Sequence, residues 1–385
     1  MIFLKKSKVF LSMLSIILSA VLMFSVFSSG IFRNDAVADV KLYNVSGKLT
    51  EIKDDLINIF NEDNNESNEK RETQKPLPQV YVGGYPIGLK LYADGVVIVG
   101  TEAVDTENGV VNTAEKAGLK LGDIIKKING TEVKSNYQVS AIIEKSAGKE
   151  LFFVVERNGK LFEVTFKAEF SKSEQKYKAG IWIRDSSAGI GTVTFCTKDG
   201  GFASLGHAVC DIDTKSSIPI SQGECTEAKL TGFIKGQNGY AGELCGYLHD
   251  KKIGTIYSND SLGVYGVFDL IPQQQKLYEI AHSSEIYIGE AEILTTIENG
   301  IIESYSVIIE KIDNKSTENK NLIIRITDRK LIDKTGGIIQ GMSGSPIIQN
   351  GKIVGAVTHV FLNDATGGFG VFAETMLYKL EQSVQ

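Results

Sequence analysis

The sequence predicts a mainly β protein that carries a membrane anchor at its N-terminus and two β domains behind it. Three observations lead to this prediction. An apolar run follows a basic start, a strongly polar stretch at 61–76 comes next, and beyond it short apolar runs alternate with turn signals and glycines. The length of 385 residues allows about two domains.

Residues 1–30 are expected to form the anchor. Three lysines precede an apolar run of 19 residues at 9–27, which is about long enough to cross the hydrocarbon core. Basic residues stay on the cytoplasmic side, so everything after the run is expected across the membrane. The triplet at 36–38, Ala-Val-Ala, resembles a cleavage site but lies well beyond the run, so anchoring is favoured over removal of a signal peptide.

Residues 31–76 are expected to contain a short juxtamembrane helix and a linker. Leu49, Ile52, Leu56 and Ile59 recur at helical spacing. The stretch 61–76 contains no aliphatic or aromatic residue, so it cannot offset the entropy cost of becoming ordered. We therefore expect a linker that is accessible to proteolysis.

Composition limits the classes of partner and cofactor. The net charge of -6, with no dense Lys/Arg cluster outside the first eight residues, argues against a nucleic-acid partner. The four cysteines are far apart and form no Cys-x-x-Cys pair, which argues against a zinc ribbon or a redox dithiol. They fit buried thiols and two disulfides equally well. We expect no cofactor and no metal.

Residues 77–172 have the pattern of a compact β domain with one or two helices. Asn-Gly pairs at 129–130 and 158–159 predict hairpins, and 137–147 carries helical spacing. The stretch "AGLKLGDIIKKING" resembles the PDZ family. This resemblance implies that Ile87, Gly88 and Leu89 supply the backbone donors that bind the terminal carboxylate of a peptide. A PDZ fold that serves only for packing or tethering is the alternative.

Residues 173–385 are rich in short strands and glycine turns, which predicts a barrel or a sandwich. Within them, "GMSGSP" places glycines on both sides of Ser343, so the backbone can turn tightly and direct N–H groups toward the hydroxyl. On its own, this motif fits a nucleophile and a simple turn equally well.

A catalytic serine requires a base, and the chain has four histidines. His207 in "FASLGHAVCD" is the preferred base, because His249 and His282 lie at polar turns. His359 follows the serine on a predicted strand, where it either lines a substrate pocket or packs.

The pattern Gly-x-Ser-Gly-x-Pro, followed by a strand, a turn and a strand, resembles the chymotrypsin-like clan of serine peptidases. This resemblance implies a double β-barrel, Ser343 as the nucleophile, and an oxyanion hole formed by the N–H groups of Gly341 and Ser343. Ser345 is a rival nucleophile. Asp328 is the closest upstream carboxylate, an unusual order for this clan. The other candidates for the acid that orients the histidine are Asp211, Asp213, Asp260 and Asp269.

A closer resemblance is carried by a PDZ region followed by "GIWIRDSSAGIGTVTF", "FASLGHAVCD" and "ITDRKLIDKTGGIIQGMSGSPIIQ". Together these resemble the stage IV sporulation protein B (SpoIVB) peptidase family. The resemblance implies a triad of His207, Asp328 and Ser343, and a role in endospore formation. The protein would be exported into the space between the forespore and mother-cell membranes and would release itself by self-cleavage. It would then cut a membrane-bound regulator of an intramembrane protease, which activates a late mother-cell sigma factor.

Two other functions fit parts of the sequence. A C-terminal processing peptidase also places a PDZ domain before a catalytic serine but uses lysine as its base, and Lys352 is the nearest lysine after Ser343. Lys352 follows an Asn-Gly turn in a predicted exposed hairpin, a poor place to desolvate an amine. A catalytically silent scaffold, in which the PDZ domain binds a partner, is the alternative from another class.

Overall fold

The computed structural model describes residues 76–316 and 318–383. The predicted anchor, juxtamembrane helix and all but the last residue of the predicted linker lie outside this part of the chain. Among the described residues, no helix is long and apolar enough to cross a membrane.

Six antiparallel strands close a first barrel. The ring runs from β11 through β2, β13, β14, β15 and β12 back to β11. The core of this barrel contains Ile87, Leu91, Phe202 and Ile256, all buried. The bounds are β2 Pro86–Thr101, β11 Ile181–Cys196, β12 Gly201–Ser204, β13 Ile220–Ile234, β14 Glu243–Asp260 and β15 Gly263–Phe268.

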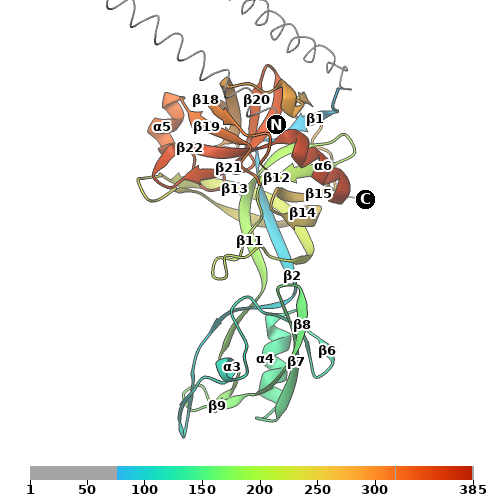
Figure 1. Cartoon of the computed structure of the whole chain (residues 1–385), viewed down its shortest axis with the longest axis vertical. Helices are drawn as coiled ribbons and strands as arrows, with labels where there is room; N and C mark the ends of the chain where they lie inside the picture. Colours follow the sequence, from blue (N-terminus) through green and yellow to red (C-terminus); the bar gives the residue numbers. More distant parts are fainter. Residues whose placement is uncertain (1–75, 317, 384–385) are drawn as a thin grey trace, which may run out of the picture. The chain divides into compact units, whose positions relative to one another are not determined.

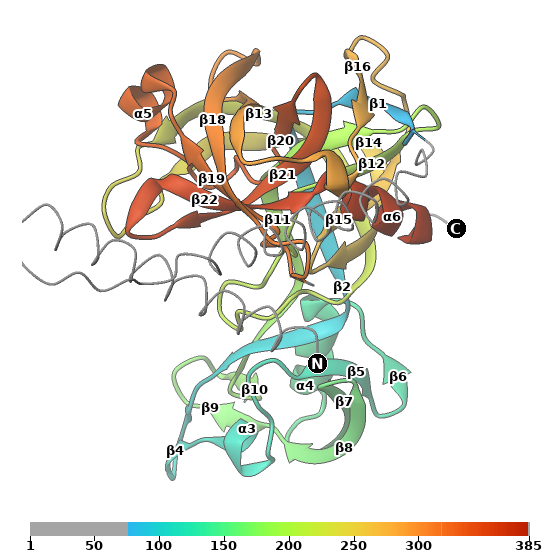
Figure 2. The ribbon, with the colours of Figure 1, turned by 45° about the horizontal axis from the view of Figure 1, so that its top comes forward.

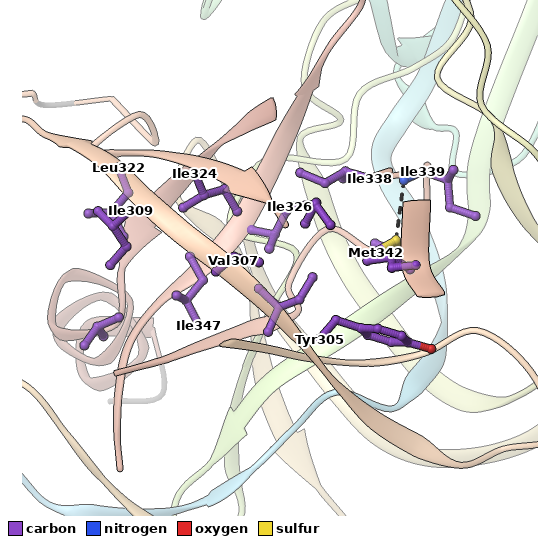
Figure 3. Packing of buried hydrophobic residues seen from close by; sticks show 14 of the residues in the cluster. Tyr305, Val307, Ile309, Leu322, Ile324, Ile326, Ile338, Ile339, Met342 and Ile347 are labelled. Carbon is purple, nitrogen blue, oxygen red and sulfur yellow. Dashed lines mark hydrogen bonds between the residues drawn. The ribbon is translucent and has the colours of Figure 1, made fainter. Parts of the chain in front are cut away.

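Six further strands close a second barrel, in the order β17, β18, β19, β22, β21, β20 and back to β17, and all these pairings are antiparallel. Alternation of side chains builds its core: on β18, Tyr305, Val307 and Ile309 point inward, while the residues between them face outward. Figure 3 shows these three residues packed with others of the same core. The bounds are β17 Gly289–Thr296, β18 Ile302–Ile312, β19 Leu322–Ile326, β20 Pro346–Gln349, β21 Lys352–Phe361 and β22 Asp364–Phe372.

Short elements join and cover the barrels. β1 (Gln79–Val82) pairs with β11 and with β16 (Leu277–Ile280), which in turn runs parallel to β21. The 3-10 helix η2 (Ser283–Glu285) follows β16, α5 (Arg329–Thr335) follows β19, and α6 (Ala373–Ser383) follows β22. The two closed rings confirm the predicted double β-barrel.

The domain predicted to be a PDZ domain is built on the second half of β2, which pairs with β5. Its hairpins turn at Asn129 and Asn158, as predicted, each in a left-handed conformation that asparagine tolerates. Its buried core includes Ile125, Val139 and Phe153. The bounds are β3 Val104–Thr106, β4 Gly109–Val111, α3 Thr113–Lys116, β5 Ile124–Ile128, β6 Thr131–Glu132, α4 Asn136–Lys145, β7 Glu150–Arg157, β8 Lys160–Lys167, β9 Glu169–Ser171 and β10 Lys176–Lys178.

The two domains share strands rather than dividing at one point of the chain. β2 and β11 pair from Thr101 with Ile181 to Pro86 with Thr192, and Figures 1 and 2 show them side by side between the PDZ elements and the barrels. This corrects the predicted PDZ boundaries of 77–172, because β1 and the first half of β2 pair with strands of the first barrel.

Candidate active site

A cavity of about 680 Å³ contains the two principal residues predicted for catalysis. Ser343 and His207 both line it, together with His359. Ser343 lies on the turn before β20, and His207 follows β12, so each barrel contributes one of them. The structure therefore brings together two residues that are separated by 136 positions in the sequence.

The turn that carries Ser343 depends on its two glycines. Gly341 and Gly344 both have φ +95°, in the left-handed region that favours glycine. A Cβ at Gly344 would lie 2.1 Å from the carbonyl oxygen of Thr192. No other residue fits there without moving the backbone, so the pattern Gly-x-Ser-Gly has a steric cause.

Strand β11 of the first barrel holds this turn through two threonines. The Thr192 hydroxyl donates to the Gly341 carbonyl at 2.7 Å, and the Thr194 hydroxyl donates to the Gly344 carbonyl at 2.8 Å. The Thr192 N–H also donates to the Ser343 carbonyl at 3.2 Å. These threonines were not singled out in the sequence, because nothing in "GTVTF" reveals which turn they contact.

Met342 anchors the turn in the second barrel. Its side chain is fully buried, and its sulfur accepts a hydrogen bond from the Ile339 N–H at 3.4 Å, drawn as the dashed line in Figure 3. The residue before the nucleophile is thus fixed in the core, while half-buried Ser343 lines the cavity.

Two backbone donors beside Ser343 remain available for an oxyanion. Within the described residues, the N–H groups of Gly341 and Ser343 donate no hydrogen bond, whereas those of Gly344 and Ser345 donate to Val357 and Met342 at 2.7 and 2.9 Å. Gly341 and Ser343 both line the cavity. The two unpaired donors are the pair predicted from the sequence for the oxyanion hole.

His207 follows two residues in the left-handed region, Leu205 with φ 66° and Gly206 with φ 69°. Its Nδ1 lies 2.8 Å from the carbonyl oxygen of Ala208. Because a carbonyl only accepts, this contact favours the tautomer with the proton on Nδ1 and leaves Nε2 free to accept one. Burial lowers the pKa of His207 below its usual value, so the ring is neutral and able to act as a base near pH 7.

His359 lies against the base. The centroids of the two imidazole rings are 4.8 Å apart. Burial of the ring, the neighbouring His207 and Lys320 lower the pKa of His359 to about 4, although part of the side chain remains exposed. His359 therefore lines the cavity and also packs against His207, so both places that the sequence left open apply. Its lowered pKa makes the residue uncharged at neutral pH.

The serine and the histidine are not hydrogen-bonded to each other in this structure. The Ser343 hydroxyl donates to the Thr358 carbonyl at 2.7 Å. Among the described residues, no hydrogen bond joins Ser343 to His207. The hydroxyl must therefore turn away from Thr358 before His207 can take its proton.

Asp328 occupies a different place from the one that the triad prediction requires. It is the N-cap of α5, where Oδ1 accepts from the Leu331 N–H at 3.1 Å and Oδ2 accepts from the Ser306 N–H at 3.4 Å. It does not line the cavity and forms no hydrogen bond with His207. The structure thus brings together two members of the predicted triad, Ser343 and His207. The third member, Asp328, caps a helix instead.

Three of the four other candidate acids are engaged elsewhere, and the fourth, Asp269, does not line the cavity. Asp211 and Asp213 both pair with Arg184, and Asp260 accepts from the Leu262 N–H at 2.8 Å. In this structure the Nδ1 of His207 is held by a backbone carbonyl instead of a carboxylate. That carbonyl belongs to Ala208, the next residue in the chain. A contact with the backbone leaves no pattern of side chains from which it could be predicted.

The rival chemistries do not fit the geometry. Ser345 is fully buried, and its hydroxyl has no hydrogen-bond partner in the described part of the chain. Lys352 pairs with Glu279 and Glu285, each at 3.0 Å, and its side-chain hydrogen bonds to these carboxylates raise its pKa. A protonated lysine cannot act as a base, so the Ser-Lys alternative loses its candidate.

The predicted carboxylate-binding residues of the PDZ domain need correction. Ile87, Gly88 and Leu89 lie in β2 and are paired on both sides, with β11 and with β13. The side chains of Ile87 and Leu89 are buried in the first barrel. A central strand has no open edge to which a peptide could add, so these residues do not form a peptide-binding loop.

The four cysteines are all free thiols. Cys196 and Cys225 are buried in the core of the first barrel, where burial raises the pKa of each thiol. Cys210 lines the cavity. The sequence left free thiols and two disulfides open, and in the structure all four cysteines are free thiols.

Comparison with known proteins identifies both domains. Residues 175–377 match the family model described as SpoIVB peptidase S55, and residues 90–167 match that of the PDZ domain. The zinc metalloprotease RasP of Shouchella clausii (strain KSM-K16) is 36% identical over 102 residues, which cover 23% of each chain. The probable periplasmic serine protease do/HhoA-like of Haemophilus influenzae is 42% identical over 65 residues, 17% of this chain and 14% of that one.

The chain thus matches less than a quarter of the length of these curated relatives. Among solved structures, the Rv3671c protease from M. tuberculosis in its active form is 18% identical over 51% of this chain and 74% of that chain, with a TM-score of 0.33.

Proposed function

Because this chain belongs to the SpoIVB peptidase S55 family, we propose that it is a serine endopeptidase in which Ser343 is the nucleophile and His207 the general base. The observation that supports this most directly is the shared cavity. It holds the serine, a neutral histidine whose Nδ1 contacts a carbonyl, and two backbone N–H groups with no other partner.

The reaction follows from these positions. Ser343 Oγ attacks the carbonyl carbon of the scissile bond as its proton passes to Nε2 of His207. The resulting oxyanion accepts hydrogen bonds from the N–H groups of Gly341 and Ser343. His207 then gives the proton to the leaving amine, and the C–N bond breaks to leave an acyl ester on Ser343. Water, deprotonated by the same histidine, hydrolyses that ester and restores the hydroxyl.

The biological role is proposed from the family resemblance. The enzyme is held in the membrane through residues 9–27, exported into the space between the forespore and mother-cell membranes, and released by self-cleavage. There it cuts a membrane-bound regulator of an intramembrane protease, which leads to activation of a late mother-cell sigma factor. Its substrates are proteins, including itself.

The experiment is a comparison of the full chain with two serine variants. Ser343→Ala should abolish self-cleavage and labelling by a fluorophosphonate probe, because it removes the hydroxyl that attacks the scissile bond and reacts with the probe. Ser345→Ala is the matched control, since its buried hydroxyl has no partner among the described residues, and it should cleave and label like the wild type. Wild-type processing by folded Ser343→Ala protein would refute the proposal.

A further inference from the structure

The chemistry of acyl transfer fixes which side of the cavity holds which part of the substrate. The carbonyl oxygen of the scissile bond must lie at the N–H groups of Gly341 and Ser343, and the leaving amine must lie next to His207, which protonates it. The side chain before the scissile bond therefore lies on the side of the second barrel, away from His207. The residues that line that side decide after which amino acids the enzyme cuts.

Much of the cavity lining is apolar. Ile338, Ile339, Val360 and Leu362 come from the second barrel and its loops, and Ala241 comes from the β13–β14 hairpin; we call these five residues the wall. Leu89, Ile190, Leu205 and Val209 line the cavity from the first barrel. Ile338 and Ile339 belong to the buried core of the second barrel (Figure 3) and are only 2% and 1% exposed. The polar Gln340, which also lines the cavity, lies between them and Gly341 of the oxyanion turn. Core packing thus fixes these two isoleucines of the wall in place.

The cavity also lacks charge. Its lining residues include no aspartate, glutamate, lysine or arginine; the ionisable groups among them are His207, His359 and Cys210. Burial lowers the pKa of both histidines and raises that of the thiol, so all three are neutral near pH 7. A charged substrate side chain placed here would lose its hydration and find no partner of opposite charge.

We propose that this enzyme cleaves after aliphatic or aromatic residues and that this preference determines where it cuts its own N-terminal part. The inference rests on the peptidase function proposed above. Residues 61–75 carry only polar and charged side chains, so the stretch with the greatest expected accessibility contains no suitable site.

The nearest apolar residues flank that stretch. On its C-terminal side, Leu77 is partly buried against the barrel core and is not available for cleavage in the folded chain. On its N-terminal side, the last apolar residues are Ile57, Ile59 and Phe60. Self-cleavage is therefore expected after an apolar residue at or before Phe60, which leaves the polar segment attached to the released enzyme.

Two measurements test this. The first uses fluorogenic peptides that differ only in the residue before the scissile bond, with Leu, Phe, Lys or Glu at that place; kcat/KM for Leu or Phe should exceed that for Lys or Glu by about 100-fold or more. The second incubates full-length wild type and Ser343→Ala protein and maps new N-termini by mass spectrometry. New termini in the wild type alone should follow apolar residues, none of them within 61–75.

A charge introduced into the wall tests whether the wall contacts the substrate side chain before the scissile bond. Val360→Glu introduces a carboxylate on a half-buried residue of the lining and should raise the ratio of Lys to Leu cleavage at least about 10-fold. Should this variant fail to fold, Leu362→Glu serves in its place, because Leu362 is 66% exposed. The control is Val110→Glu, an exposed valine of the PDZ domain, which should leave the ratio unchanged.

The outcomes separate the two proposals. Comparable cleavage after Lys, Glu and Leu, or a Ser343-dependent cut within 61–75, overturns the inference and leaves the peptidase function standing. If the ratio of Lys to Leu cleavage is unchanged in the folded wall variants, the wall does not contact the substrate side chain before the scissile bond. The absence of any Ser343-dependent cleavage overturns the proposed function itself.

Discussion

Replacing Asp328 with asparagine should leave catalysis close to the wild-type level, whereas replacing it with alanine should reduce stability. The carboxylate accepts from the Leu331 N–H at 3.1 Å as the N-cap of α5 and from the Ser306 N–H at 3.4 Å. Asparagine caps a helix about as well as aspartate does. The base does not depend on either residue, because Nδ1 of His207 contacts the Ala208 carbonyl.

The size of the effect follows from the contacts that alanine removes. Loss of an N-cap costs about 1 kcal/mol, and the longer contact with Ser306 adds little to that. A loss of about 1 kcal/mol lowers the Tm of a domain of 150–250 residues by roughly 2–4 °C. Asp333→Ala is the control, since Asp333 lies in the same helix, is exposed, and its carboxylate has no partner in the described residues.

The assay combines thermal unfolding, followed by circular dichroism, with kcat/KM on a peptide that the wild type cleaves. We expect Asp328→Ala to have a lowered Tm, and we expect wild-type values for Asp328→Asn and Asp333→Ala. A fall in kcat of about 10⁴-fold in Asp328→Asn at unchanged Tm, the size expected for loss of a triad carboxylate, would refute this reasoning. It would mean that Asp328 reaches His207 in the working enzyme.

Two further predictions concern the base and the nucleophile turn. Activity should persist below pH 6.5, because burial lowers the pKa of His207 from its ordinary value of about 6.5 and the neutral ring is lost only as the pH falls through the lowered pKa. His359→Gln should not move this acid limb of kcat/KM, since His359, with a pKa of about 4, is uncharged there; a shift of the limb would contradict the expectation. Thr194→Val removes the donor to the Gly344 carbonyl and should destabilise the protein by about 1 kcal/mol and lower kcat. Urea unfolding should show no such loss for Thr226→Val, whose buried hydroxyl has no partner among the described residues; equal losses in both variants would argue against the role of Thr194.

Features with a local cause could be predicted from the sequence. The hairpins at Asn129 and Asn158 require left-handed residues, and Asn-Gly supplies them at low cost. The glycines around Ser343 are required because φ is +95° at both and a Cβ at Gly344 would collide with the backbone of β11. Such constraints act within a few residues, so the sequence displays them directly.

Features with a long-range cause could not be predicted. Alternation in "YPIGLKL" predicts a strand but not its neighbours, and Ile87 pairs with Gly191 and Glu227, more than 100 residues away. The placement of Asp328 is different, because the sequence contains the pattern of a helix N-cap at this position. An aspartate before a helical pattern that ends at Gly336 is the usual mark of an N-cap, so Asp328 could have been assigned to this role from the sequence.

The shared strands give the two domains a common structural frame. β11 begins beside the PDZ core, where Ile181 and Ile183 pack against it, and near its other end it carries Thr192 and Thr194, which hold the nucleophile turn. Side chains alternate along a strand, so a slip of one residue would turn both threonines away from the turn. The pairing is interrupted by register shifts near Arg184, and such irregularities bend and twist a strand locally. One strand thus connects the PDZ core with the nucleophile turn, but its pairing with β2 changes register twice between them. The register that places the two threonines is therefore set by the pairs on the barrel side of these shifts, from Ser186 with Tyr92 to Thr192 with Pro86.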